Sequence, residues 1–491
     1  MTPRTVVGSV GTPVLLLLTG CSFLVEVHRE PAHEAGAAGA AGEGGVGAAG
    51  HAGAAGHAGG DVGSGGAAGQ GGAGRHSSAG PLQLSGAPLL FAPTAHGFGL
   101  NVVLESGDPS QLTARIRSQG ESTFADALPS EVVAADVAEW VFEGLRPGTR
   151  YEYQVLGEED GLVAALYSGS VVTQRESGDP FTFALLTDPH IGPEEQFSNQ
   201  GNWATLAAVA EEIGAATPDF MINLGDMLDF HLFGFNVPPP DGSYTRQAYL
   251  NYRGLLGDTL GHAAHYPVIG NWEGENGNFA ADEIAWSREK RLIYMPGPSP
   301  TTYPEGGSEY EDYYAFTWGD ALFIVLNVMS YTPTEHVLAR ASDPEDWTLG
   351  DAQMQWFETT LEHATSRWRF VLIHHTVGGA AGDDADSGYG RGGGQAAQVG
   401  EQAVVHQLML DHGVQIFFYG HDHVFTDMVV DGIHYSLPGS AGAIWMFDET
   451  ITGYEQAWLQ SGWARVDVSP DAVDVQFIAL GGELLYEYTV E

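Results

Sequence analysis

From about residue 179 onward, short apolar runs alternate with amphipathic segments. Apolar runs rich in β-branched and aromatic residues predict buried strands at 181–186, 220–224, 314–317, 322–326, 370–373 and 415–419. Residues 203–213 repeat apolar side chains at helical spacing, and further helices are predicted at 280–291, 351–363 and 398–410. The tail, residues 463–490, alternates like two or three antiparallel strands. Such mixed strand directions predict an α/β fold, a two-sheet α/β sandwich over residues 179–491.

Residues 81–176 carry a different, all-β pattern. Alternating runs at 99–104, 112–117 and 139–142 are separated by turn residues. A Pro147-Gly148 turn then leads into a strand whose first tyrosine, Tyr151, is expected to close a tyrosine corner. The pattern predicts a small β-sandwich in front of the α/β domain. Its role stays open between packing and positioning on one side and carbohydrate or protein binding on the other.

The first eighty residues predict no packed domain. Residues 22–80 are mostly Gly and Ala, a composition typical of a disordered tether. Residues 1–21 have a short apolar stretch that ends in Leu18-Thr19-Gly20-Cys21, which resembles a bacterial lipobox. That resemblance implies a lipoprotein signal peptide and a membrane anchor on lipidated Cys21, with Ser22 directing the protein to the outer membrane. An ordinary signal peptide with an incidental cysteine is the alternative.

The chain is strongly acidic, with 63 Asp and Glu against 18 Lys and Arg and a formal net charge of -45. Nucleic-acid binding needs a basic surface, so that class of function is excluded. Any anionic substrate must instead be held by local positive charge, which metal ions can supply. Cys21 is the single cysteine, so no disulfide can form within the chain.

Five short polar blocks follow apolar runs in the α/β region. Their metal-capable or acidic members are Asp188 and His190, Asp226 and Asp229, Asn271 and Glu273, His374 and His375, and His421, Asp422 and His423. Any one block alone also occurs in ordinary turns. Strand ends converge at one edge of an α/β sheet, however, so blocks far apart in sequence can meet in one cleft.

The order and spacing of these blocks resemble the calcineurin-like metallophosphoesterase superfamily, and the preceding sandwich resembles the fibronectin type III-like domain of purple acid phosphatase-like enzymes. The resemblance implies two divalent or trivalent cations, Zn, Mn or Fe, that share Asp226. It implies one held by Asp188, His190, Asp226 and His423, and the other by Asp226, Asn271, His374 and His421. It also implies hydrolysis of a small phosphate ester, either a monoester or a diester, by a metal-bridging hydroxide.

The residues themselves suggest why such a site could form. In an extended segment, side chains two positions apart point the same way, so Asp188 and His190 could reach one ion, as could His421 and His423. Glycine before Asp226 and before the third and fifth blocks is expected to allow a sharp backbone turn. A shared carboxylate would bring two cations to about 3.5–4 Å, the separation used in two-metal phosphoryl chemistry.

Two positions depart from the family pattern. Trp272 stands where most members carry a histidine that protonates the leaving group or steadies the transition state, and an indole cannot be a general acid at neutral pH. His231, His375 and Glu273 are unranked replacements, and Trp272 could instead wall the site against an organic leaving group. Asp229 stands where purple acid phosphatases carry a tyrosine ligand, which makes a purple iron–tyrosinate centre unexpected.

The expected catalytic set is therefore Asp226, Asn271, Trp272 and His375. Arg391 could contact phosphate or could be a solvated loop residue. The alternative function is a surface binding or adhesion lipoprotein with a degenerate, metal-binding phosphatase domain. A metallo-β-lactamase-like hydrolase is excluded because its His-x-His-x-Asp-His block is missing from the sequence.

Overall fold

The computed structural model describes residues 81–159, 161–194, 201–229, 242–333, 346–377, 400–443 and 454–491. All of these residues belong to one compact unit, residues 75–491. The predicted signal peptide (1–21) and tether (22–80), together with His231 and Arg391, lie outside the described residues and stay predictions. Among the helices that are described, none has both the length and the apolar character to cross a membrane.

The N-terminal part is an all-β sandwich of two antiparallel sheets. One sheet contains β1 (Gln83–Leu84), β2 (Leu89–Thr94), β3 (Gly97–Ser106), β7 (Val137–Glu143) and β6 (Glu131–Ala134). The other contains β5 (Leu128–Pro129), β4 (Leu112–Ser118), β8 (Arg150–Glu159) and β9 (Leu162–Val172), and the short helix η1 (Pro109–Gln111) connects β3 to β4. The tyrosine corner is confirmed, because the Tyr151 hydroxyl accepts a hydrogen bond from Arg146 N at 3.0 Å.

The α/β part is built on two sheets, each six-stranded within the described residues. The first sheet runs in the order β12 (Ala264–Pro267), β11 (Phe220–Asn223), β10 (Phe181–Leu186), β19 (Gly462–Val468), β20 (Val473–Ala479) and β21 (Glu483–Val490). The second runs in the order β13 (Tyr314–Trp318), β14 (Ala321–Val325), β15 (Trp368–Leu372), β16 (Ile416–Phe418), β18 (Ile433–Pro438) and β17 (Phe425–Val430). In the first sheet β12, β11 and β10 are parallel at one edge, and the other three strands are antiparallel. In the second sheet the interior strands β14, β15, β16 and β18 are parallel, and β13 and β17 are antiparallel at its two edges.

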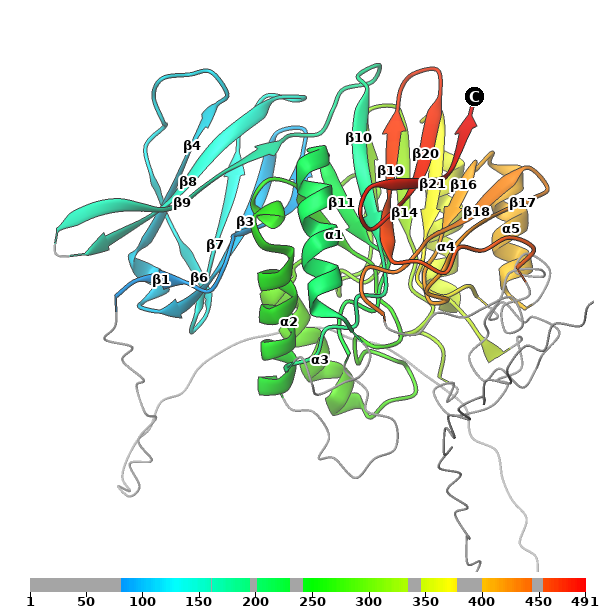
Figure 1. The fold of residues 1–491 in the computed structure, drawn as a ribbon, viewed down its shortest axis with the longest axis horizontal. Helices are drawn as coiled ribbons and strands as arrows, with labels where there is room; N and C mark the ends of the chain where they lie inside the picture. Colours follow the sequence, from blue (N-terminus) through cyan, green and yellow to red (C-terminus); the bar gives the residue numbers. More distant parts are fainter. Residues whose placement is uncertain are drawn as a thin grey trace, which may run out of the picture. The chain divides into compact units, whose positions relative to one another are not determined.

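Helices cover the outer faces of the two sheets (Figure 1). They are α1 (Trp203–Ala216), α2 (Gly242–Leu256), η2 (Gly257–Gly261) and α3 (Ala281–Tyr294) on the side of the first sheet, and α4 (Gly350–His363) and α5 (Gln402–Asp411) on the side of the second. Alternate residues of one strand serve different layers. Phe183 on β10 faces the core between the sheets, whereas Ala184 packs under the helices. Burial on both faces explains why these strands read as continuous apolar runs.

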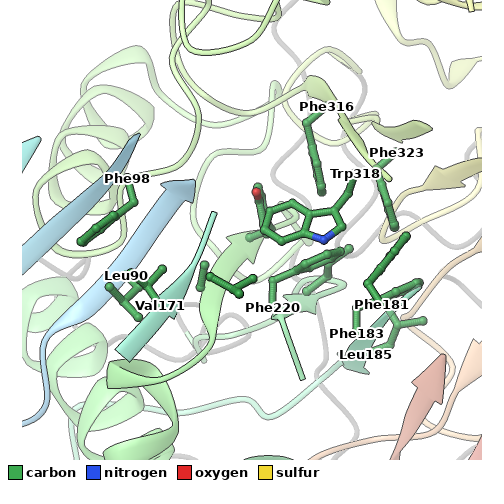
Figure 2. Packing of buried hydrophobic residues seen from close by; sticks show 14 of the residues in the cluster. Leu90, Phe98, Val171, Phe181, Phe183, Leu185, Phe220, Phe316, Trp318 and Phe323 are labelled. Atoms are coloured by element: carbon green, nitrogen blue, oxygen red, sulfur yellow. The ribbon is translucent and has the colours of Figure 1, made fainter. Parts of the chain in front are cut away.

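The core between the sheets is dominated by aromatic rings (Figure 2). Phe183 and Phe220 stack with ring centroids 5.3 Å apart, and Phe323 of the second sheet meets Phe183 edge-on at 5.1 Å. Trp318 lies 4.8 Å from Phe220. Offset and edge-on ring pairs of this kind add to the energy of area burial, so these contacts fix the two sheets against each other.

Buried polar contacts join the β-sandwich to α2 and α3. Arg253 of α2 donates to the Asn101 side-chain oxygen at 2.5 Å, to the Asn101 carbonyl at 3.0 Å and to the Tyr294 carbonyl at 2.9 Å. Asn101, which is fully buried, donates in turn to Glu139 at 2.6 Å and to the Ile293 carbonyl at 2.9 Å. Because every group in this network is satisfied, the sandwich is an integral part of the packed unit.

The sequence prediction did not include α2, η2, β12, β17 or β18. In α2 the buried positions include Tyr249 and Tyr252, whose hydroxyl groups make the pattern read as polar although both side chains are fully buried. The spacing of Ala248, Tyr249, Tyr252 and Leu256 is nevertheless helical, and that spacing could have revealed the helix.

Candidate metal centre

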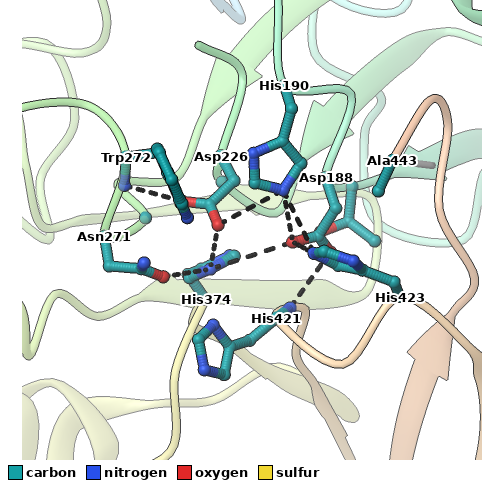
Figure 3. Close-up of polar contacts among 12 residues, drawn as sticks. Asp188, His190, Asp226, Asn271, Trp272, His374, His421, His423 and Ala443 are labelled. Carbon is teal, nitrogen blue, oxygen red and sulfur yellow. Dashed lines mark hydrogen bonds and ion pairs between the residues drawn. The ribbon is translucent and has the colours of Figure 1, made fainter. Parts of the chain in front are cut away.

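The five polar blocks meet at one edge of the two sheets. Each follows a parallel strand: β10 and β11 and β12 in the first sheet, and β15 and β16 in the second. Among the described residues, two buried groups have ligand atoms within 4.8 Å of one another, Asp188/His190/Asp226/His423 and Asp226/His374/His421. Figure 3 shows these side chains pointing toward one another, with Asn271 beside His374. The seven side chains proposed as ligands therefore come together, and Asp226 belongs to both groups.

The backbone brings them together differently from the prediction. Asp188, His190, Asp226, His421 and His423 all have positive φ angles, from 52° to 79°. The expectation of extended segments with side chains two positions apart pointing the same way is therefore wrong. A left-handed residue turns the chain sharply. Two such turns in Asp188 and His190, and two in His421 and His423, bring both side chains of each pair to the centre. Non-glycine residues rarely adopt this conformation, and it concentrates at functional sites.

The glycines have two different roles. Gly225 does have a positive φ of 105°, as expected for a sharp turn. Gly270 and Gly420 do not have positive φ, so the turn argument is wrong for them. A Cβ on Gly270 would lie 2.2 Å from Asp226 Oδ1, and one on Gly420 would lie 2.4 Å from Thr187 Oγ1. These two glycines are needed for space between the ligand loops.

Asp188 presents one carboxylate oxygen to the centre, and hydrogen-bond donors of the protein hold the other. Its Oδ2 accepts from Thr187 Oγ1 at 2.7 Å and from His421 N at 3.0 Å. Its Oδ1 is buried, accepts no hydrogen bond from the part of the chain that the structure describes, and lies 3.3 Å from His423 Nε2 and 3.7 Å from His190 Nε2. Burial works against the charged carboxylate, yet the imidazoles of His423 and His190 hold the pKa of Asp188 well below its ordinary value.

Asp226 repeats this arrangement between the two groups. Its Oδ1 accepts from Trp272 N at 2.8 Å, while its Oδ2 lies 3.0 Å from His374 Nε2 and 3.7 Å from His190 Nε2. His374 Nδ1 lies 2.8 Å from the Leu224 carbonyl, a contact that requires the proton on Nδ1 and leaves Nε2 as the ligand atom. Burial opposes a charged His374 ring, but the neighbouring Asp226 carboxylate raises its pKa to about 9.

Asn271 lies between the centre and the indole of Trp272. One end of its amide lies 3.2 Å from His374 Nε2 and 3.0 Å from His421 Nδ1, and the other end lies 3.0 Å from Trp272 Nε1. With the oxygen inward, the amide oxygen and two imidazole nitrogens converge on one space, an arrangement that suits a bound cation. The Trp272 ring also meets His190 edge-on, with centroids 5.5 Å apart.

These contacts fit divalent cations. In both carboxylates one oxygen is held by protein donors, while the other faces imidazole nitrogens in a buried space. The imidazoles His190 and His423 bring their Nε2 atoms to 3.1 Å of each other, a close approach that a shared cation would explain. Mixed nitrogen and oxygen ligation suits Zn, Mn or Fe.

The candidates for leaving-group protonation differ in their surroundings. Glu273 accepts from Gly270 N at 2.6 Å, from Asp226 N at 3.2 Å and from Leu228 N at 3.3 Å, so it ties two ligand loops together. Burial, reinforced by the charge of Asp226, raises its pKa to about 8. His375 stacks on Trp347 at 4.2 Å and packs against His421 at the same distance, which supports a positioning role.

Asp229 is an unusual buried carboxyl group. Its side chain is fully buried, and within the described residues neither oxygen accepts a hydrogen bond. Burial raises its pKa to about 7, and the nearby His190 only partly opposes this effect. Its backbone is well fixed, since Asp229 N donates to Ile191 O at 3.1 Å and Tyr244 donates to Asp229 O at 2.7 Å.

Several supporting residues escaped the sequence prediction. Thr187 anchors Asp188, and Ser440 Oγ donates to the Asp188 carbonyl at 3.1 Å. Tyr454 donates to Asp422 Oδ2 at 2.6 Å. Thr187 directly precedes the first block and could have been found by its position, whereas Ser440 and Tyr454 follow the last block by many residues and have no recognisable pattern around them.

Comparison with known proteins adds one family match. Residues 181–425 match the family model described as Calcineurin-like phosphoesterase, a span that contains all five blocks. A search of curated proteins gave no match. Among solved structures, the chain is similar to GAP50, the anchor in the inner membrane complex of Plasmodium, at 15% identity and a TM-score of 0.39, covering 64% of this chain and 89% of that one.

Two further solved structures share this similarity. A conserved uncharacterized protein, a predicted phosphoesterase from Streptococcus pneumoniae TIGR4, has 12% identity and a TM-score of 0.25 over 64% of this chain and 99% of its own. Wild-type Vps29 complexed with Zn²⁺, from Entamoeba histolytica, has 11% identity and a TM-score of 0.27 over 63% of this chain and 98% of its own. At these TM-scores the similarities carry no argument about function.

Proposed function

Because residues 181–425 form a calcineurin-like phosphoesterase domain with candidate metal ligands, we propose that this chain is a two-cation hydrolase of small phosphate esters. The observation that carries the proposal is the pair of buried ligand groups with Asp226 in common. A shared carboxylate holds two cations close together, which is the arrangement of two-metal phosphoryl chemistry.

The cations would supply Lewis-acid activation of water and neutralisation of phosphate oxygens. The protein's own residues position them. Thr187 and His421 N hold Asp188, Trp272 N holds Asp226, and the Leu224 carbonyl fixes the tautomer of His374. No Ser, Thr or Cys nucleophile occurs within the five blocks themselves, so the proposed hydrolysis is direct, without a phosphorylated enzyme.

Trp272 constrains which esters would react well. An indole donates one hydrogen bond but does not transfer its proton at neutral pH. Leaving groups that depart readily as anions, such as phenols, are therefore the expected substrates, since a general acid contributes about 10²–10⁴-fold where it is needed. Monoesters and diesters are both compatible with the site.

The test combines metal analysis with hydrolysis assays. Purified protein is expected to contain up to two equivalents of Zn, Mn or Fe and to hydrolyse an aryl phosphomonoester or an aryl phosphodiester. Asp226→Ala should abolish both properties, whereas Asp474→Ala, on the exposed side of β20, should change neither. Retained turnover in Asp226→Ala would overturn the proposal.

A second candidate function is a surface binding or adhesion lipoprotein whose phosphatase domain binds metal without catalysis. Trp272 is the observation that favours it, because the position lacks a proton donor. The presence of every proposed ligand in one buried centre favours the enzyme. Two bound cations with no hydrolysis of aryl monoesters or diesters would favour the binding protein.

The proposal extends to the surroundings of the domain. We propose that residues 81–176 are a fibronectin type III-like domain in a purple acid phosphatase-like architecture, and that the protein is a bacterial extracytoplasmic lipoprotein anchored in the outer membrane through Cys21. Labelling with a radioactive fatty acid tests the anchor: incorporation should be lost in Cys21→Ala, and an unlabelled wild type would contradict it.

A further inference from the structure

Trp272 and the second ligand group compete for one atom, the side-chain oxygen of Asn271. The amide has only two orientations. Its inner end lies 3.2 Å from His374 Nε2 and 3.0 Å from His421 Nδ1, and its outer end lies 3.0 Å from Trp272 Nε1. The indole nitrogen can only donate, so it prefers the oxygen on the outside.

Each orientation of the amide gives a favourable contact either to Trp272 or to a cation in the second ligand group, but not to both. With the oxygen outside, the amide nitrogen lies within hydrogen-bond distance of Asp226, His374 and His421, and the oxygen accepts from Trp272 Nε1. With the oxygen inside, it can bind a cation, but two N–H donors then face each other at 3.0 Å. A cation that binds to Asn271 must therefore first replace one hydrogen bond with a repulsive contact, which lowers its affinity.

The charges of the two ligand groups also favour tighter cation binding at the first group than at the second. The first group contains two carboxylates, Asp188 and Asp226, whereas the second has only the shared Asp226 and a neutral amide. Asp188 is also held in its charged form, because its Oδ2 accepts two hydrogen bonds from Thr187 and His421 N. A divalent cation is thus attracted more strongly to the first group.

We propose that Trp272 makes the two cation sites unequal, so that the site of Asp188, His190 and His423 fills first and the site of Asn271, His374 and His421 holds a weaker, exchangeable cation. This inference rests on the proposed function. It assigns Trp272 a positioning role that acts through the Asn271 amide. At low cation concentration the protein would carry a single ion, and activity would rise only as the second site filled.

The experiment is a calorimetric titration of cation-free protein with Mn²⁺, which measures binding without any reaction. Two binding steps are expected, with dissociation constants at least tenfold apart. Trp272→Phe keeps an aromatic ring against His190 but removes the N–H donor, and it should tighten the weaker step by on the order of tenfold, the equivalent of one hydrogen bond. The stronger step should not change.

The control is Trp463→Phe, which removes an equivalent indole donor, one that bonds to Glu212 at 3.1 Å. It should leave both steps as in the wild type. Unchanged or weakened binding at the second step in Trp272→Phe would overturn the inference. If neither step is seen in the wild type, the proposed function itself fails, which is a distinguishable outcome.

A second measurement uses the wild-type protein, so it does not depend on whether a variant folds. In protein labelled with ¹⁵N on its indole nitrogens, the Trp272 Nε1–H resonance should stay in place during the first equivalent of cation and shift during the second. The resonance is expected to move upfield as its acceptor is lost. A shift complete at the first equivalent would contradict the inference.

Discussion

Tyr454 donates its phenolic hydrogen to Asp422 at 2.6 Å, and Asp422 lies between the two histidines of the last block that are proposed as ligands. Tyr419 donates to Tyr454 at 2.9 Å, so a buried chain of three polar side chains supports the turn that carries His421 and His423. Outer partners of this kind orient the residues that bind a metal.

Tyr454→Phe should therefore weaken cation binding. Loss of an outer hydrogen bond typically lowers metal affinity by about 10–100-fold. A titration of cation-free protein measures the change. Tyr488→Phe is the control, since Tyr488, half-buried on β21, shares a hydrogen bond with the Ser436 hydroxyl, and this variant should keep the cation affinity of the wild type. Equal affinities for Tyr454→Phe and wild type would show that Asp422 needs no such support.

The interface of the sandwich with α2 should depend on Arg253. Arg253→Met removes the donor to two Asn101 oxygens and to the Tyr294 carbonyl, all in a buried network. Buried acceptors left unsatisfied should lower the free energy of unfolding by about 2–5 kcal/mol, measured by urea denaturation. Arg246→Met on the same helix breaks a more exposed pair with Asp136 and should cost about 1 kcal/mol or less. Similar losses in the two variants would argue against a special role for the network.

Glu139 should make stability depend on pH. Burial, partly offset by the hydrogen bond from Asn101, raises the pKa of Glu139 to about 7 from its ordinary 4.5. Because the folded state binds this proton more tightly than the unfolded state, the stabilisation is complete below about pH 4.5 and is lost as the pH rises toward 7. Its charged neighbours are Glu311, Glu131 and Arg253.

Glu139→Gln keeps the acceptor for Asn101 and removes the titration. The free energy of unfolding of the variant relative to wild type should therefore rise between pH 4.5 and pH 8 by on the order of 3 kcal/mol. Urea denaturation at several pH values measures this difference. A difference that stays constant with pH would mean that Glu139 keeps its ordinary pKa.

The aromatic core should be sensitive to a single deletion. Phe220 lies against Phe183, Trp318 and Phe323, with ring centroids 4.8–5.4 Å away. Phe220→Ala should lower the free energy of unfolding by about 3–5 kcal/mol. Val141→Ala, at a position that is 64% exposed, should change it by no more than about 0.5 kcal/mol. Thermal and urea denaturation of the two variants provide the comparison.

Much of the fold could be predicted because burial leaves a pattern in the sequence. The predicted strand at 181–186 coincides with β10, since both faces of that strand are buried. Helix α2 was missed because its buried face, although helical in spacing, includes Tyr249 and Tyr252 with their hydroxyl groups, and that of Tyr252 is paired with Asn223. A pattern of apolar residues does not reveal a tyrosine whose polar group is satisfied inside the protein.

The candidate site was predictable in its members and not in its geometry. The order of the blocks identified the side chains that lie together, from Asp188 to His423. The order of the blocks did not predict the backbone conformation. Hydrophobic periodicity indicates which face of an element is buried and contains no information on the sign of φ. The contact between Asn271 and Trp272 was equally hidden, since it depends on which way an indole turns within the folded site.

The left-handed backbone at five of the proposed ligands implies a trade-off between the stability of the fold and the binding of cations. Asp188, His190, Asp226, His421 and His423 occupy conformations that glycine adopts with less strain. The cost of that strain is part of the free energy of folding, so the loops need little rearrangement when a cation binds. Variants selected only for heat resistance should accordingly accumulate glycine at Asp188 and Asp226, and they would gain stability while losing the metal centre.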